Sequence, residues 1–310
     1  MSGVVGGLAV FGVVIALGWL LVRTGAVPVG SDNVLTRVCF FAATPALMFT
    51  TVQAADLGTV LSRPTAVALA AELLAVVSAW LLHRVVLRRD VASATIGSLA
   101  SGYVNAGNLG IPVTVLVLGN ATPVAPVLLL QLLVLTPLAF TVLDAVTRRG
   151  HPSRLGALTV ALRNPLVLAV AAGVVANLAG WSPASVLGGN VATLLDLLGR
   201  MAVPLMMLAL GMSVRGAPAP HARGADLALW CAVGWKVLVA PGLALALGAA
   251  LGLRGPGLLV PVTTACLPTA QNVFMYASRY GVAKPLARDA VLLTTVAFVP
   301  VLLLAAAVLH

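Results

Sequence analysis

Apolar stretches of roughly twenty residues follow one another along almost the whole chain, and this is the length at which an α-helix crosses the hydrocarbon core of a bilayer. The connections between them are too short to hold a separate soluble domain. We place ten such stretches at about 3–22, 34–52, 65–87, 92–118, 123–146, 164–181, 190–212, 226–253, 256–279 and 286–309. Because 61% of the residues are hydrophobic and only 8% are charged, the sequence predicts an all-α integral membrane protein with about ten spanning helices.

The distribution of basic residues predicts the orientation of these helices. The net charge of +10 is dispersed over short loops, without the aromatic-interleaved basic tract that is typical of nucleic-acid binding. The odd-numbered loops hold fourteen Lys and Arg residues, whereas the even-numbered loops and both termini together hold two. By the positive-inside rule, we expect a multi-pass protein of the cell (plasma) membrane with both termini outside.

Residues suited to enzymatic or metal chemistry are scarce. The three cysteines are isolated inside apolar segments, and the four histidines share no metal-ligand spacing. Neither a phosphate-binding glycine loop nor a serine nucleophile turn occurs in the chain. An integral-membrane lipid enzyme would need a cluster of acids, histidines or a nucleophile at one membrane face, so we predict no catalytic residues, no metal and no cofactor.

Two apolar stretches are interrupted at what should be bilayer depth. Residues 105–112 read Asn-Ala-Gly-Asn-Leu-Gly-Ile-Pro, and residues 267–272 read Leu-Pro-Thr-Ala-Gln-Asn. Prolines and glycines free backbone polar groups from a helix, and hydrocarbon tolerates such groups only where they are buried in protein or line a cavity. A pair of breaks in corresponding positions of two halves indicates a transporter binding site.

The chain contains an internal repeat with an offset of 159 residues. The sequence around Pro45 resembles the sequence around Pro204, and the same offset brings the interruption in the fourth stretch onto the interruption in the ninth. Repeats with an odd number of spans enter the membrane from opposite sides. We therefore predict two inverted five-helix repeats, 1–147 and 164–310, joined by a cytoplasmic linker, 148–163.

These motifs resemble the auxin efflux carrier family, which includes plant PIN auxin exporters and permeases for malonate and related organic acids. The resemblance is carried by Asn105 to Pro112 and by Pro268, Asn272 and Tyr276 to Gly281, and it extends over essentially the whole chain. It implies the crossover fold of sodium/proton antiporters and bile-acid symporters, in which the broken fourth and ninth helices cross. It also implies a homodimer. The chain lacks the long central hydrophilic loop of the plant members, so it is similar to the short bacterial form.

The chemistry of a broken helix indicates which residues contact substrate. Each half-helix that starts at a break offers free N–H groups and a partial positive charge, which suit a small anion. Amide side chains can cap such a half-helix, bind a carboxylate, or do both, while proline and glycine shape the backbone. The predicted binding residues are Asn105, Asn108, Gly110, Pro112, Pro268, Gln271 and Asn272.

Ionisable residues inside spans are costly and therefore informative. Glu72 and Lys236 lie on the helices that directly precede the broken ones, where they either neutralise half-helix dipoles or take part in proton coupling or recognition of substrate charge. Asp196 and Arg200 are four residues apart on one helical face, which favours a structural ion pair.

Together these features predict a secondary transporter of small organic anions, such as carboxylates or auxin-like acids. We expect efflux driven by the membrane potential, through an elevator-like movement. A proton- or sodium-coupled symporter is the alternative within the same fold, and an integral-membrane lipid enzyme is the alternative from another class.

Overall fold

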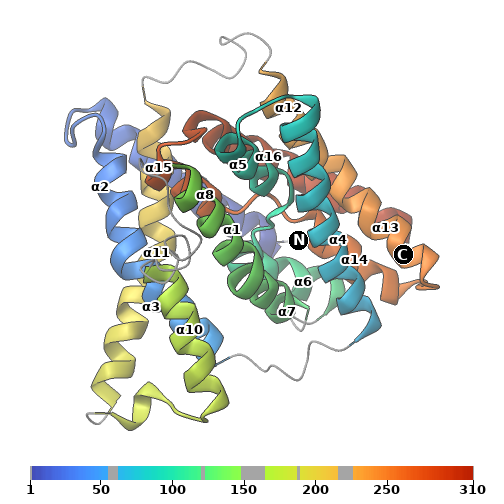
Figure 1. Cartoon of the computed structure of the whole chain (residues 1–310), viewed down its shortest axis with the longest axis horizontal. Coiled ribbons are helices and arrows are strands. Elements are labelled where there is room, and N and C mark those ends of the chain that lie inside the picture. Colours follow the sequence, from blue (N-terminus) through green and yellow to red (C-terminus); the bar gives the residue numbers. More distant parts are fainter. Residues whose placement is uncertain are drawn as a thin grey trace. The chain divides into compact units, whose positions relative to one another are not determined.

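The structure is a computed structural model that describes residues 2–54, 62–119, 123–147, 165–186, 189–215 and 226–309. The predicted linker 148–163 lies outside this part of the chain. All regular elements in the described residues are helical (Figure 1). The first half of the chain contains α1 (Ser2–Arg23), α2 (Ser31–Val38), α3 (Thr44–Gln53), α4 (Arg63–Leu81), α5 (Val91–Gly102), α6 (Ile111–Leu118), α7 (Val124–Leu130) and α8 (Thr136–Thr147). The second half contains α10 (Pro165–Leu178), α11 (Asn190–Val214), α12 (Leu227–Gly234), α13 (Ala240–Ala250), α14 (Pro256–Cys266), α15 (Gln271–Tyr280) and α16 (Lys284–Leu309).

Six continuous helical segments of the described chain are long and apolar enough to cross a membrane. They are Ser31–Gln53, Arg63–Val86, Val124–Thr147, Asn190–Val214, Leu227–Ala250 and Lys284–Ala305. Three shorter apolar helices, Gly12–Arg23, Pro165–Leu178 and Gly257–Cys266, add to them. The all-helical membrane class predicted from composition is therefore confirmed, while ten spans and inverted repeats stay predictions.

Some prolines inside the long helices follow short π-helical turns. The segments η1 (Cys39–Ala43), η5 (Gln131–Leu135) and η9 (Trp235–Val239) each end two residues before a proline. A proline ring clashes with the carbonyl four residues earlier and removes one helical hydrogen bond. A widened turn just upstream relieves both effects, so the helix continues instead of breaking.

The chain forms two compact units, and each unit takes segments from both predicted repeats. One unit comprises Met1–Gly12, Leu57–Leu128 and Gly216–His310, and the other comprises Val13–Asp56 and Leu129–Arg215. We call them the crossing unit and the scaffold unit. The division into repeats 1–147 and 164–310 concerns the sequence and stays a prediction.

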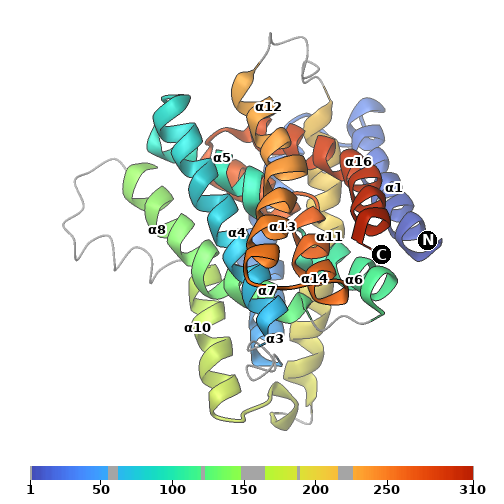
Figure 2. The ribbon, with the colours of Figure 1, turned by 90° about the vertical axis from the view of Figure 1, so that its right-hand side faces the viewer.

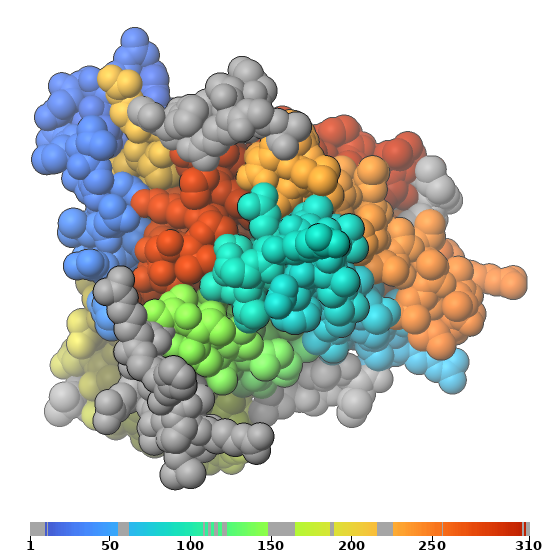
Figure 3. Space-filling model, turned by 45° about the horizontal axis from the view of Figure 1, so that its top comes forward, coloured from blue at the N-terminus to red at the C-terminus, as the bar shows by residue number. Residues whose placement is uncertain are grey.

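In the crossing unit, α4 packs against α5, α13 and α14, and α16 packs against α14 and α15 (Figures 1 and 2). The space-filling view shows atoms of α5, in teal, against those of α12, in orange (Figure 3). The core of this unit gathers buried apolar side chains from α4, residues 104–109, α6, α7, α13, α14 and α16, with Leu267 and Phe298 almost fully enclosed.

In the scaffold unit, α3 packs against α10 and α11. Two glycines allow α1 and α11 to approach closely, because a Cβ atom on Gly211 would lie 1.9 Å from the carbonyl oxygen of Ile15. A Cβ atom on Gly18 would likewise lie 2.3 Å from the carbonyl oxygen of Leu208. Small residues are how helices in a membrane bring their backbones together.

Asp90 determines where α5 begins. Its backbone is extended, and its carboxylate accepts a hydrogen bond from the N–H of Ser93 at 2.9 Å. Hydrogen bonding with Ser93 lowers the pKa of the Asp90 carboxyl from its ordinary value of 3.8. This is the usual chemistry of an acidic N-cap, where the charged form satisfies a helix N–H that has no other partner.

Loss of this cap is expected to have a small and pH-dependent effect on stability. We expect Asp90→Ala to lower the free energy of unfolding by about 1 kcal/mol. A carboxyl whose pKa is lower in the folded state stabilises the protein above its unfolded pKa, and this contribution is lost as pH falls through the folded pKa. Wild type should therefore lose the contribution below about pH 4. Thermal unfolding in detergent at a series of pH values measures both effects.

Asp90→Asn is the matched control, because an asparagine caps a helix without ionising. Its stability at neutral pH should stay close to wild type, and its acid response should be smaller. An acid response equal to that of wild type would mean that Asp90 does not carry this pH dependence.

Candidate functional site: the paired helix breaks

The two interrupted helices meet at their breaks, within the crossing unit. The α5 helix ends at Gly102 and the chain resumes as the π-helical segment η4 (Ala106–Gly110), which leads into α6. On the other side α14 ends at Cys266 and α15 begins at Gln271. The two extended segments between these helices lie side by side as an antiparallel bridge between Val104 and Thr269.

Backbone hydrogen bonds across the breaks replace those that the helices lose. The N–H of Asn105 donates to the carbonyl of Pro268 at 2.8 Å, and the N–H of Ala270 donates to the carbonyl of Tyr103 at 3.1 Å. Pro268 has no N–H to satisfy, and it favours an extended conformation for Leu267, which is observed. The breaks therefore stabilise one another at a depth where water is scarce.

Threonine hydroxyls complete the backbone pairing. Thr269 Oγ1 donates to the carbonyl of Ala100 in the last turn of α5 at 2.6 Å. The N–H of Thr269 donates in turn to Thr294 Oγ1, on α16, at 3.1 Å. The sequence analysis did not predict a role for Thr269 or Thr294. Threonine occurs widely in this chain, and its sequence context does not indicate which group it will hydrogen-bond.

Two of the predicted amide side chains bind each other. Asn105 Nδ2 donates to Gln271 Oε1 at 2.9 Å, although the two residues are 166 positions apart in the sequence. Both are buried. Gln271 Nε2 is also buried and has no hydrogen-bond partner within the described part of the protein. An amide N–H₂ without a partner, at the first residue of α15, is a donor available to an anion.

The other predicted binding residues lie around this pair. Asn272 is the second residue of α15 and is half-buried, and Pro268 is buried in the break. Gly110 ends η4, where a Cβ atom would lie 3.1 Å from Val124 of α7. The side chains of Asn108 and Pro112 lie outside the part of the chain that the structure describes.

Glu72 and Lys236 lie on either side of the same crossing. Lys236 is in η9 and is 1% exposed, and its Nζ donates to the carbonyl of Ala265 at 3.1 Å. Glu72, in α4, is buried, and its Oε1 accepts a hydrogen bond from the N–H of Val104 at 3.3 Å. The cation thus lies at the carbonyl end of α14, where the helix dipole is negative. The Glu72 carboxylate accepts a hydrogen bond from the N–H of Val104, which lies in the break between α5 and η4.

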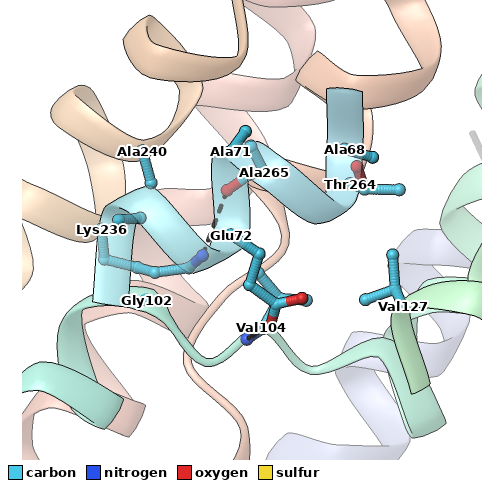
Figure 4. A pocket seen from close by; sticks show the side chains of 11 residues that line it. Ala68, Ala71, Glu72, Gly102, Val104, Val127, Lys236, Ala240, Thr264 and Ala265 are labelled. Atoms are coloured by element: carbon cyan, nitrogen blue, oxygen red, sulfur yellow. Dashed lines mark hydrogen bonds between the residues drawn. The ribbon is translucent and has the colours of Figure 1, made fainter. Parts of the chain in front are cut away.

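Both charged side chains line one small cavity, which Figure 4 shows from close by. Alanines of α4 and α13, Gly102, Val104, Val127 and Thr264 complete its walls. It offers about 10 Å³ to the centre of a water-sized sphere. This is room for about one water molecule, so an organic acid does not fit beside Lys236 in this conformation.

The chain is similar to known proteins over almost its whole length. The sequence model of the membrane transport protein family matches residues 5–306. The chain belongs to this family. The resemblance to auxin efflux carriers that the two interruptions indicate is thereby confirmed.

Two relatives of this membrane transport protein carry transporter names. An uncharacterized transporter of Methanothermobacter thermautotrophicus is 27% identical over 289 residues, which cover 92% of this chain and 91% of the relative. A proposed malonate transporter of Rhizobium meliloti is 30% identical over 221 residues. That match covers 67% of this chain and 65% of the relative, so the chain spans just under two thirds of that relative's length.

The predicted ion pair of Asp196 and Arg200 lies in the scaffold unit of this transporter. Arg200 Nε contacts Asp196 Oδ2 at 2.7 Å on α11, and both side chains are exposed. An i,i+4 pair of this kind is worth only a few tenths of a kcal/mol where water surrounds it. Neither residue belongs to the unit that contains the paired breaks.

Sequence reasoning missed a buried ion pair in α16 of the same transporter. Arg288 Nε contacts Asp289 Oδ1 at 2.6 Å, and the two residues are only 6% and 4% exposed. Adjacent residues of a helix point in different directions, so their spacing gives no sign of pairing. In the described residues no group of three or more His, Cys, Asp or Glu side chains is placed to hold a metal ion.

Proposed function

We propose that this membrane transport protein is a secondary carrier of small organic anions, with dicarboxylates of the malonate type as its first candidates. The observation that carries the proposal is the buried amide group at the paired breaks. Gln271 directs an amide donor without a partner from the first residue of α15, and Asn105 holds that amide in place. A carboxylate accepts hydrogen bonds from such donors and is favoured at the positive end of a helix.

The name of the Rhizobium meliloti relative supports the choice of substrate class. A malonate-type acid has two carboxylates, and each of the two half-helices that start after the breaks can face one of them. Asn108 and Asn272, next to the starts of these half-helices, are proposed to complete the contacts, with Gly110, Pro112 and Pro268 shaping the backbone.

Efflux needs no partner ion in this proposal. Moving one negative charge outward across a membrane that is negative inside gains about 2.3 kcal/mol per 100 mV, which corresponds to a roughly fiftyfold gradient at equilibrium. The division into a crossing unit, which holds the site, and a scaffold unit, which does not, supports an elevator-like movement. With both termini outside, as the loop charges predict, this direction leads from the cytoplasm to the cell exterior.

Purified protein in liposomes is expected to exchange labelled malonate against unlabelled malonate with saturable kinetics. Saturable counterflow distinguishes a carrier from a pore. In a parallel thermal-shift series, an acid present at 100 times its dissociation constant should stabilise the protein by about 2.7 kcal/mol. Monocarboxylates, tricarboxylates and an indole acid serve as comparison ligands, and absence of both exchange and stabilisation for every acid would reject the proposal.

A further inference from the structure

Two tyrosines lie against each other beside the paired breaks. The rings of Tyr103, at the end of α5, and Tyr276, in α15, have centroids 6.3 Å apart and planes at 89°. This edge-to-face arrangement is a favoured one for an aromatic pair. The two side chains are 1% and 0% exposed, and they are the largest fully buried side chains in the described part of the chain. Because both rings are enclosed, neither offers a face on which an aromatic ligand could stack.

The backbone places the Tyr103 ring on the same side of the break as the amide pair. The chain is extended at Tyr103 and pairs with the opposite break at Val104. Side chains in an extended segment alternate between its two faces, so those of Tyr103 and Asn105 point the same way. Asn105 binds the Gln271 amide, and the Tyr103 carbonyl accepts a hydrogen bond from the N–H of Ala270. The ring of Tyr103 therefore lies beside the two amides.

Tyr276 reaches the same place from α15. It stands four residues after Asn272, so the two side chains lie on one face of the helix. Helical side chains lean toward the N-terminus of their helix, which brings the Tyr276 ring over the first turn of α15. Gln271 and Asn272 begin this turn. The two tyrosine rings thus fill the space next to the amides that are proposed to bind a carboxylate.

We propose that Tyr103 and Tyr276 limit the size of the acid that this carrier accepts, because their rings occupy the volume that the ring of an aromatic acid would need. A malonate-type acid has only a methylene group between its carboxylates and needs no such volume. A phenyl or indole acid has to place a ring beside its carboxylate. This inference rests on the proposed function, and it adds that two particular side chains exclude aromatic acids.

The test compares full-length wild type with Tyr276→Ala in liposomes, using labelled malonate and labelled phenylacetate. Wild type should exchange malonate and not phenylacetate. Removal of a buried ring leaves a cavity, and an apolar cavity of this kind can bind a ligand such as benzene. Tyr276→Ala should therefore exchange phenylacetate about tenfold faster than wild type, or more. Tyr276→Phe is the matched control, because it keeps the ring and should keep the selectivity of wild type.

Binding is measured as well, because loss of a buried tyrosine destabilises a protein. Tyr103→Ala removes the other ring and should show the same gain as Tyr276→Ala. In thermal unfolding in detergent, phenylacetate should raise the Tm of both alanine variants by several degrees relative to acetate at equal concentration. Wild type and Tyr276→Phe should show no such difference, since their own rings fill the space.

The outcomes separate this inference from the proposed function. If wild type exchanges malonate but neither alanine variant gains exchange or stabilisation by phenylacetate, the size limit is wrong and the carrier function stands. If wild type exchanges no acid at all, the proposed function is wrong. Exchange of phenylacetate by wild type would contradict the inference directly. Failure of both alanine variants to fold, even with phenylacetate present, would also contradict it, because a ligand ring would then not replace the missing side chain.

Discussion

Gln271→Leu is expected to lower malonate exchange in liposomes to the level of empty liposomes while the protein still inserts and purifies as a single species. The physical reason is that leucine has a similar size but removes both the amide that faces the break and the acceptor that holds Asn105. Removing a side chain that hydrogen-bonds the substrate weakens substrate binding strongly, because buried polar groups of the substrate and the site are then left unpaired. We expect a loss of at least about a hundredfold in transport rate.

Gln53→Leu is the matched control for this experiment. It makes the same chemical change in the scaffold unit, where Gln53 donates to the carbonyl of Trp181. Its transport should stay within about threefold of wild type, since surface changes of this kind cost about 0.5 kcal/mol. Asn272→Ala should also abolish exchange. Normal exchange by both Gln271→Leu and Asn272→Ala would show that the paired breaks are not the binding site.

Neutralising Lys236 alone is expected to cost about 3–5 kcal/mol of stability, because it leaves the buried charge of Glu72 without compensation. Lys236→Met keeps roughly the length of the side chain but removes its charge. Glu72→Gln should also lower the stability, because it leaves the buried charge of Lys236 without compensation. The double variant should recover much of the loss, because removing both partners of a buried charge pair costs less than removing one.

Unfolding midpoints in one detergent, combined in a double-mutant cycle, measure this coupling. Lys284→Met is the matched control, since that lysine lies over the ring of Phe274 and its replacement should cost less than about 1 kcal/mol. Lys236→Arg should retain part of the stability. A double variant that is as unstable as the sum of the single variants would show that Glu72 and Lys236 act independently.

The positions of the helix breaks could be predicted from local sequence. Prolines and glycines at 105–112 and 267–272 identify the places where the helices stop, because the chemistry that stops a helix is local. The same reasoning predicted long helices through Pro45, Pro137 and Pro241, but not the π-helical turns that precede these prolines. Those turns depend on how each helix relieves its clash, and several local solutions are available to the same residues.

The contacts of the buried charged residues could not be predicted from local sequence. Composition marked Glu72 and Lys236 as exceptional, because ionisable groups are rare in an apolar span. The sequence left two roles open for them, and the structure places each at a backbone group freed by a break. Arg288 and Asp289, by contrast, stand near a predicted helix start and gave no sign of being buried together.

The sequence by itself determined that this protein is helical, crosses a membrane and has two interrupted helices with amides at the interruptions. These properties follow from hydrophobicity, helix length and backbone chemistry, all of which act within about twenty residues. Only the tertiary structure decided that Asn105 binds Gln271, that Thr294 holds Thr269, and that Lys236 closes the end of α14. Each of these contacts joins segments that are separate in the sequence, and its geometry depends on packing that no single segment specifies.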